Sequence, residues 1–159
     1  MERLREVFSK QGFKNVRTHI NSGNVIFEAE GAPAKWLGRI EKAVAAEIKR
    51  DVSVMVRTAA ELKKVISGNP FRKDKSIEAK RLLVMFLSGQ LSKEAVKKLA
   101  AIDCGDDGYH VAGRELYLYC RGGINESKFF RMDFEKVLGV SATGRNWNTV
   151  NKLLEMASI

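Results

Sequence analysis

The chain has 159 residues, enough for one domain or two small ones, and 45% of them are hydrophobic, which is ordinary for a protein with a buried core. The formal net charge of +9 favours anionic partners. No apolar run reaches the length of a transmembrane helix, and the N-terminal residues lack the apolar core of a signal peptide. The two cysteines, Cys104 and Cys120, lack metal-ligand spacing. These features predict a cytoplasmic protein with no metal site and no cofactor.

The first half of the chain predicts a helix, a hairpin, a second helix, a strand and a third helix. The apolar spacing indicates a helix over 2–11, hairpin strands Val16–Ile20 and Asn24–Ala29, a helix from Pro33, a strand Val52–Arg57 and a helix from Thr58 to Ile66. Thr58 and Glu61 have the spacing of a capping box. The polar, basic residues that follow predict a linker over 69–79.

The second half predicts strands and helices in the order βαββαβ, with one more helix at the end. The elements are expected at Arg81–Leu87, a helix capped by Ser92, Tyr109–Ala112, Glu115–Cys120, a helix over 126–138, and a strand, a turn at Gly144 and a helix within Val140–Leu154. Arg81–Leu87 is apolar on both faces, which indicates a strand covered on both sides.

The two halves resemble each other in sequence. The matching positions are Val52 with Val140, Ser53 with Ser141, Arg57 with Arg145, and Lys64 with Lys152. Since βαββαβ is the ferredoxin-like order, we predict an α+β fold made by tandem duplication of ferredoxin-like units, with a C-terminal helix. The expected divisions are a first half at 1–68, a linker at 69–79 and a second half at 80–159.

The first half lacks the opening strand of this pattern. In a ferredoxin-like sheet that strand is central, so its absence leaves a gap between the hairpin and Val52–Arg57. An open edge invites pairing with another chain. We therefore expect a partner strand, for instance in a homo-oligomer formed through this edge, or irregular packing of the first half, or a shortened version of a longer protein. The third outcome is favoured.

Four stretches resemble the domain-of-unknown-function family numbered 1697. They are Asn15–Phe27, with its Ser-Gly-Asn-Val segment, Asn69-Pro-Phe71, Gly113–Tyr117, and Thr143–Lys152, with its Arg-Asn-Trp-Asn-Thr segment. The resemblance implies a bacterial-type cytoplasmic protein with two ferredoxin-like halves, and it implies no activity. Members of that family usually begin further upstream, with an apolar strand and a glycine-rich segment, and the chain departs from the family there.

A polar or anionic ligand site is expected where the last helix begins. Arg145 lies at the N-terminus of that helix, where free N–H groups favour the binding of an anion. Asn146 and Asn148 are its neighbours. The equally polar hairpin turn adds the candidate residues Asn21, Ser22 and Asn24. The structural alternative is that Asn146 caps the helix and Trp147 packs between the two halves.

Nucleic-acid binding is a second expectation. Tyr117 and Tyr119 fall on one face of a strand, where two aromatic rings on an open sheet would resemble an RNA-stacking platform. Basic residues in and directly after the predicted linker would contact phosphates, namely Lys73, Lys75, Lys80 and Arg81. The Lys/Arg-Gly-Phe-Gly-Phe motif of RNA-recognition modules is missing from the sequence. Its absence counts against this interpretation.

The sequence identifies no reaction. His19 and His110 lie on matching hairpin strands, where a histidine is usually structural, and no second ligand residue lies at metal spacing. The prediction is a non-enzymatic protein that binds an anionic ligand, a nucleic acid or another polyanion through a basic surface, away from membranes. The alternatives are a small-molecule enzyme of unidentified chemistry and a protein-interaction module.

Overall fold

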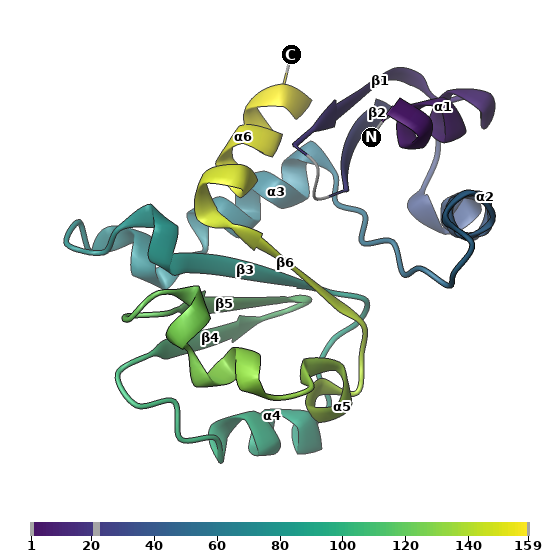
Figure 1. Ribbon diagram of the computed structural model, residues 1–159. Coiled ribbons are helices and arrows are strands. Elements are labelled where there is room, and N and C mark those ends of the chain that lie inside the picture. Colours follow the sequence, from purple (N-terminus) through teal and green to yellow (C-terminus); the bar gives the residue numbers. More distant parts are fainter. Residues whose placement is uncertain (1, 21–22, 159) are drawn as a thin grey trace. The chain divides into compact units, whose positions relative to one another are not determined.

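The computed structural model describes residues 2–20 and 23–158 as an α+β protein that divides into two compact units (Figure 1). The first unit comprises residues 1–59 and 153–159, and the second comprises residues 60–152. Helix α3 (Ala59–Ser67) therefore belongs almost wholly to the second unit, so the division lies before the expected linker at 69–79.

The N-terminal part of the first unit shows two α-helices and one hairpin among its described residues. Its elements are α1 (Glu2–Lys10), β1 (Lys14–His19), β2 (Asn24–Glu28), a short 3-10 turn η1 (Pro33–Lys35) and α2 (Leu37–Ile48). The antiparallel hairpin pairs Thr18 with Val25, and its register shifts between Lys14 and Arg17. Asn15 has a positive φ of 51° at this irregularity.

An aromatic and aliphatic core holds this unit together. Phe8 of α1, Trp36 and Ile40 are buried, and the Phe27 ring lies 5.0 Å from the Phe8 ring and 5.4 Å from the Trp36 ring. Aromatic pairs at these centroid separations contribute beyond their buried area. The hairpin and the two helices are thus joined by aromatic and aliphatic contacts.

The prediction of a strand over Val52–Arg57 is wrong. Residues 51–58 form no strand, although Val52, Val54 and Val56 pack against the same core. The Val54 N–H donates to the Glu41 carboxylate of α2 at 2.9 Å. The alternating valines thus partly bury one face of the segment, but a strand also needs a neighbouring strand, and none pairs with it among the described residues.

The second unit contains a four-stranded antiparallel sheet. Its strands are β3 (Leu82–Leu87), β4 (Gly108–Ala112), β5 (Glu115–Tyr119) and β6 (Ala142–Asn146), in the order β4-β5-β3-β6. All six residues of β3 are buried, because both of its edges are paired and both of its faces are covered. The continuous apolar run from Leu82 to Leu87 is the sequence signal of this position.

Helices cover one face of this sheet. Leu83, Met85 and Leu118 pack against α4 (Lys93–Ala100) and α5 (Phe134–Leu138), which lie together on that face (Figure 1). Leu99 of α4 and Leu138 of α5 are buried in this contact. Val84, Tyr117 and Arg145 project from the opposite face, because paired residues of an antiparallel sheet share a side.

The helix expected over 126–138 is broken into three pieces. They are η4 (Ile124–Glu126), η5 (Lys128–Arg131) and α5. Ser127 accepts a hydrogen bond from the Phe129 N–H, and Asp133 accepts one from the Lys136 N–H, so each starts a new turn. These local side-chain bonds compete with a continuous helix.

The sequence predicted a turn at Gly144 before the last helix. That prediction is wrong, because Gly144 lies inside β6. It pairs with Met85, and a Cβ at this position would lie 2.7 Å from the Met85 Sδ atom. The glycine therefore makes room for a neighbouring side chain. Helix α6 (Trp147–Ala157) then begins directly after the strand.

Candidate polyanion-binding surface

The tyrosine platform expected on the sheet is covered. Tyr117 is 2% exposed, and its hydroxyl donates to the Val65 carbonyl of α3 at 2.7 Å. Burial, followed by the charge of Glu115, raises the pKa of Tyr117 to about 12. Tyr119 is half-buried, with its ring centroid 5.9 Å from that of Phe71. Tyr117 therefore has no face open to a nucleic-acid base, and this part of the prediction is wrong.

The Arg145 guanidinium bonds along its own strand. Its Nη1 atom donates to the Thr143 hydroxyl and to the Gly144 carbonyl, both at 2.8 Å. The side chain is half-buried on the sheet face next to Val84, and this burial lowers the pKa of Arg145. The structure thus gives Arg145 intramolecular bonds and leaves its role toward a ligand as a prediction.

The asparagines of the expected ligand site serve local structure. The Asn146 side-chain oxygen accepts from the Asn148 N–H at 2.9 Å, which is the capping role of the structural alternative. Asn148 itself is exposed. In the hairpin, the Asn24 side chain is 7% exposed and donates to the His19 carbonyl at 3.1 Å. Asn21 and Ser22 lie outside the described residues.

The two histidines lie in different surroundings. His19 is half-buried in β1 of the first unit, whereas His110 is exposed in β4 of the second. The His110 ring lies 6.1 Å from the ring of Tyr117. Within residues 2–20 and 23–158, no group of three histidine, cysteine or carboxylate side chains could hold a metal ion.

The basic segment after α3 is ordered by capping bonds. Asn69 accepts from the Phe71 N–H at the start of η2 (Pro70–Lys73), and Asp74 accepts from both the N–H and the hydroxyl of Ser76. These bonds lower the pKa of Asp74. The Phe71 ring would meet any Cβ placed on Gly108 of β4, at 3.1 Å. The expected linker is therefore a folded part of the second unit.

This segment presents its lysines to solvent. Lys73, Lys75 and Lys80 are exposed, and Arg81 is half-buried. Lys80 and Arg81 both lie in η3 (Ala79–Arg81), and both form ion pairs with Glu78, at 3.1 and 3.7 Å. Exposed pairs of this kind contribute little energy, so they leave the lysine available to an external anion.

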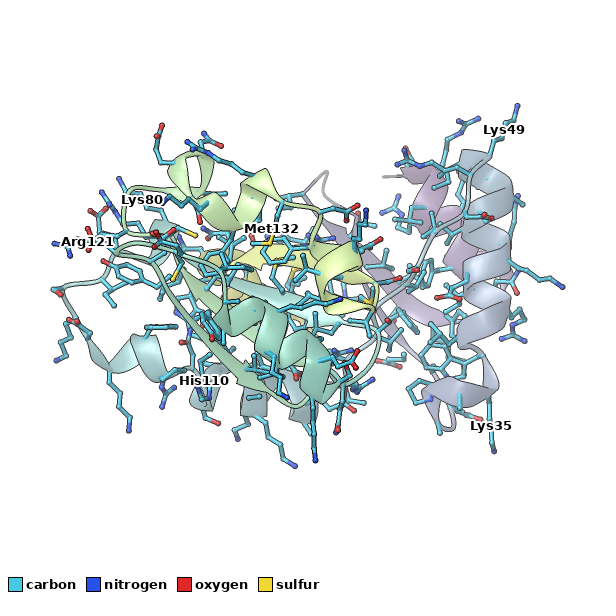
Figure 2. The ribbon with its side chains drawn as sticks, turned by 90° about the horizontal axis from the view of Figure 1, so that it is seen from below. Lys35, Lys49, Lys80, His110, Arg121 and Met132 are labelled. Carbon is cyan, nitrogen blue, oxygen red and sulfur yellow. The ribbon has the colours of Figure 1, made fainter. Side chains whose placement is uncertain are left out.

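Arg121 adds a further basic residue to this group, at the end of strand β5. The Cys120 N–H donates to the Arg81 carbonyl at 2.8 Å, which places the end of β5 beside the start of β3. Lys80 and Arg121 lie at the same end of the second unit (Figure 2). We call the side chains of Lys73, Lys75, Lys80, Arg81 and Arg121 the basic edge. Sequence reasoning missed Arg121, although the predicted strand order would have placed it there.

A shallow pocket of about 340 Å³ adjoins Arg121. Its charged lining is mixed, with Asp106, Asp107 and Glu126 beside Arg121 and Lys128. The Asp107 carboxylate is already engaged, since it accepts from the Arg121 N–H at 2.9 Å and the Ser127 hydroxyl at 2.7 Å. A single small anion would meet three carboxylates here, so the pocket does not favour one.

Two cysteines lie at or beside this pocket. Cys120 is buried, and desolvation raises the pKa of its thiol. The Cys104 thiol donates to the Asp107 carbonyl at 3.3 Å. Neither histidine lines the pocket, so it lacks the histidine and carboxylate pair that would indicate an enzyme.

Comparisons with known proteins identify a family and a similar fold. A family model described as "Protein of unknown function (DUF1697)" matches residues 1–117. A search of curated proteins found no match. The solved structure of the conserved bacterial protein SP0830 from Streptococcus pneumoniae is similar, with a TM-score of 0.81 and 16% identity over 100% of this chain and 89% of that chain. At this identity the likeness shows the fold alone. No helix in the described part of the chain is long and apolar enough to cross a membrane.

Proposed function

Because the chain belongs to the DUF1697 family, whose description assigns no function, we propose a function from its surface: the protein binds a polyanion, of which single-stranded RNA is the preferred probe, through the basic edge. The observation that carries the proposal is the density of charge. Residues 63–81 contain seven basic and two acidic side chains, a net charge of +5 within a chain of net charge +9. Dense basic surfaces attract phosphates by releasing condensed counterions.

The geometry favours an extended polyanion over a small anion. Lys73, Lys75 and Lys80 are spread along an exposed segment instead of converging on one point, and the neighbouring pocket contains carboxylates. Since Tyr117 is buried, the contacts should be made to phosphates and not to bases. We therefore propose binding with little sequence preference and strong salt dependence, with a Kd of about 10⁻⁶–10⁻⁴ M near physiological salt.

The test compares two charge-reversal triples by fluorescence anisotropy with a labelled 20-nucleotide RNA. The first triple, Lys73→Glu, Lys75→Glu and Lys80→Glu, alters the basic edge. The control triple, Lys93→Glu, Lys97→Glu and Lys98→Glu, alters exposed lysines of α4 by the same net charge. Raising salt from 50 to 200 mM should weaken wild-type binding at least about tenfold.

The basic-edge triple should weaken binding at 50 mM salt about tenfold more than the control triple does, because it removes phosphate contacts as well as net charge. Equal losses in the two triples would show that net charge alone attracts RNA, and the basic edge would then be no site. Absence of binding at 50 mM salt would overturn the proposal as a whole.

We also propose that the two halves are duplicated ferredoxin-like units in a reducing, cytoplasmic protein. The order β4-β5-β3-β6, antiparallel throughout, supports the assignment for the second half. Hairpin β1–β2 matches β4–β5, and residues 51–58 before α3 match β6 before α6. The free thiols of Cys104 and Cys120 support the reducing setting.

A further inference from the structure

One cationic side chain of the hairpin is half-buried and has no partner among the described residues. Arg17 lies in β1, and its Nε atom is buried without a hydrogen-bond partner. No carboxylate in residues 2–20 and 23–158 forms an ion pair with its guanidinium. Burying a charged donor without a partner is costly, and such a group calls for an acceptor such as an ion. The Nε atom of Arg17 therefore marks a place for an external acceptor.

Arg17 faces away from the core of the first unit. It pairs with Ile26 of β2, whereas the next pair along the hairpin, Thr18 and Val25, contains a side chain that packs on the core. Paired residues of an antiparallel hairpin share a face, and successive residues of a strand alternate between faces. Arg17 and Ile26 thus lie together on the face opposite the core, which we call the outer face of the hairpin.

His19 adds a second polar side chain to the outer face. It follows Arg17 by two residues in β1, so the two side chains leave the strand on the same side, about 6.5 Å apart. His19 is half-buried, and its backbone carbonyl accepts from the Asn24 side chain at 3.1 Å, which holds the strand end in place. No described residue bonds to the His19 imidazole. Both side chains are long enough to reach one small anion between them.

The charges on the outer face select the kind of anion. Lys14 and Arg17 are the cations of this face, and Glu28, which pairs with Lys14, is its carboxylate, so the fixed charges sum to +1. Lys14 and Glu28 are exposed, and Glu28 accepts from the Asn15 side chain at 2.8 Å. A net charge of +1 suits a monoanion better than a phosphate dianion. Ile26 is half-buried and offers an apolar contact beside the guanidinium.

We propose that Arg17 binds a small carboxylic acid on the outer face of the hairpin, with His19 as a second donor and Ile26 against the apolar group of the acid. The Nε–H and one Nη–H of a guanidinium form a fork that matches the two oxygens of a carboxylate, and such charge-assisted bonds are strong. The bound acid supplies the missing acceptor, so binding removes the cost of an unpaired buried donor. The site lies in the first unit and is independent of the basic edge, which lies in the second.

The experiment measures carboxylate binding by the full chain, with benzoate as the probe and benzamide as its uncharged isostere. Thermal unfolding is followed with each probe in Tris buffer free of carboxylate and phosphate, and the Arg17 Nε–H resonance is followed by NMR. Arg17→Met removes the charge and keeps an apolar chain, whereas Arg17→Lys keeps the charge without the fork. Arg50→Met, at an exposed position of the same unit, is the matched control.

Benzoate at about ten times its Kd should raise the Tm of wild type and of Arg50→Met by about 2–5 °C, and benzamide should not. Both Arg17 variants should bind benzoate at least about tenfold more weakly. Without a probe, Arg17→Met should unfold at the temperature of wild type or above it, because the variant lacks the unpaired buried charge. In wild type the Arg17 Nε–H resonance should shift as benzoate binds, which tests the proposal even if a variant does not fold.

Four results would overturn the proposal. If benzamide stabilises wild type as well as benzoate does, the protein recognises the apolar ring and not the charge. If inorganic phosphate stabilises wild type more than benzoate does, the site takes a phosphate. If benzoate stabilises Arg17→Met as much as wild type, the carboxylate binds elsewhere. If benzoate leaves both the Tm and the Arg17 Nε–H resonance of wild type unchanged, water alone satisfies the guanidinium.

Discussion

The Tyr117 hydroxyl donates to the Val65 carbonyl at 2.7 Å, and this bond ties the central part of β5 to helix α3. Val65 lies in the last turn of α3, where helix carbonyls have no partner within the helix. The bond therefore satisfies a buried acceptor and positions the helix over the sheet. It also explains why α3 groups with the second unit and why the tyrosine ring is closed to ligands.

Tyr117→Phe should destabilise the protein by about 1–2 kcal/mol, because the ring still packs but the Val65 carbonyl loses its donor. Urea unfolding followed by circular dichroism measures this loss. Tyr119→Phe is the matched control, since Tyr119 is half-buried on the same face of β5. An equal loss in both variants would show that the Tyr117 hydrogen bond has no special role.

The same residue predicts a pH dependence of stability. The pKa of Tyr117 is about 12 in the folded protein, against about 10 for an ordinary tyrosine, so the folded state binds the proton more tightly. The raised pKa of Tyr117 contributes about 2–3 kcal/mol to the free energy of unfolding. This contribution is complete below pH 10 and is lost as the pH rises through 12. The stability difference between wild type and Tyr117→Phe should therefore shrink between pH 9 and pH 11. A constant difference across this range would contradict the assigned pKa.

Local patterns predicted the elements whose shape depends on their own residues. The six-residue apolar run of β3 predicted a strand covered on both faces, and Glu115–Cys120 and Tyr109–Ala112 predicted the hairpin now seen as β4 and β5. In each case the pattern of burial follows directly from the period of the chain.

The rest depended on partners that a local pattern does not contain. Residues 52–57 needed a neighbouring strand to become one. The apolar spacing over 126–138 predicted one continuous helix. Two capping side chains in it, Ser127 and Asp133, each start a new helical turn instead. Tyr117 was assigned correctly to one face of its strand, but which helix covers that face is a tertiary fact. Arg121 was missed for another reason, since the predicted ferredoxin-like order already made β3 and β5 neighbours but its position at the strand end was not used.

Gly144→Ala should destabilise the second unit by about 1–3 kcal/mol, because the new Cβ would lie 2.7 Å from the buried Met85 sulfur. In the absence of that clash, alanine in a strand would be neutral or stabilising. Gly89→Ala is the control, since its nearest neighbour, Val140, is 4.0 Å away. Thermal unfolding of both variants, together with Met85→Ala and the double variant, measures the coupling. Additive losses in the double variant would show that the two residues do not compete for space.

The last prediction concerns Asp107, which organises the loops beside the basic edge. Its carboxylate accepts from the Arg121 N–H and from the hydroxyl of Ser127, a residue that is 2% exposed. Asp107→Ala should cost about 2–4 kcal/mol of unfolding free energy, since it removes the acceptor of a buried hydroxyl and of a backbone donor. Asp106→Ala, at the exposed neighbouring position, should cost less than about 0.5 kcal/mol. Urea unfolding compares the two variants, and Asp107→Asn should fall between them because its amide oxygen can replace one of the two bonds. If Asp106→Ala and Asp107→Ala unfold at the same urea concentration, the Asp107 bonds do not stabilise these loops, and Arg121 is held in place by other contacts.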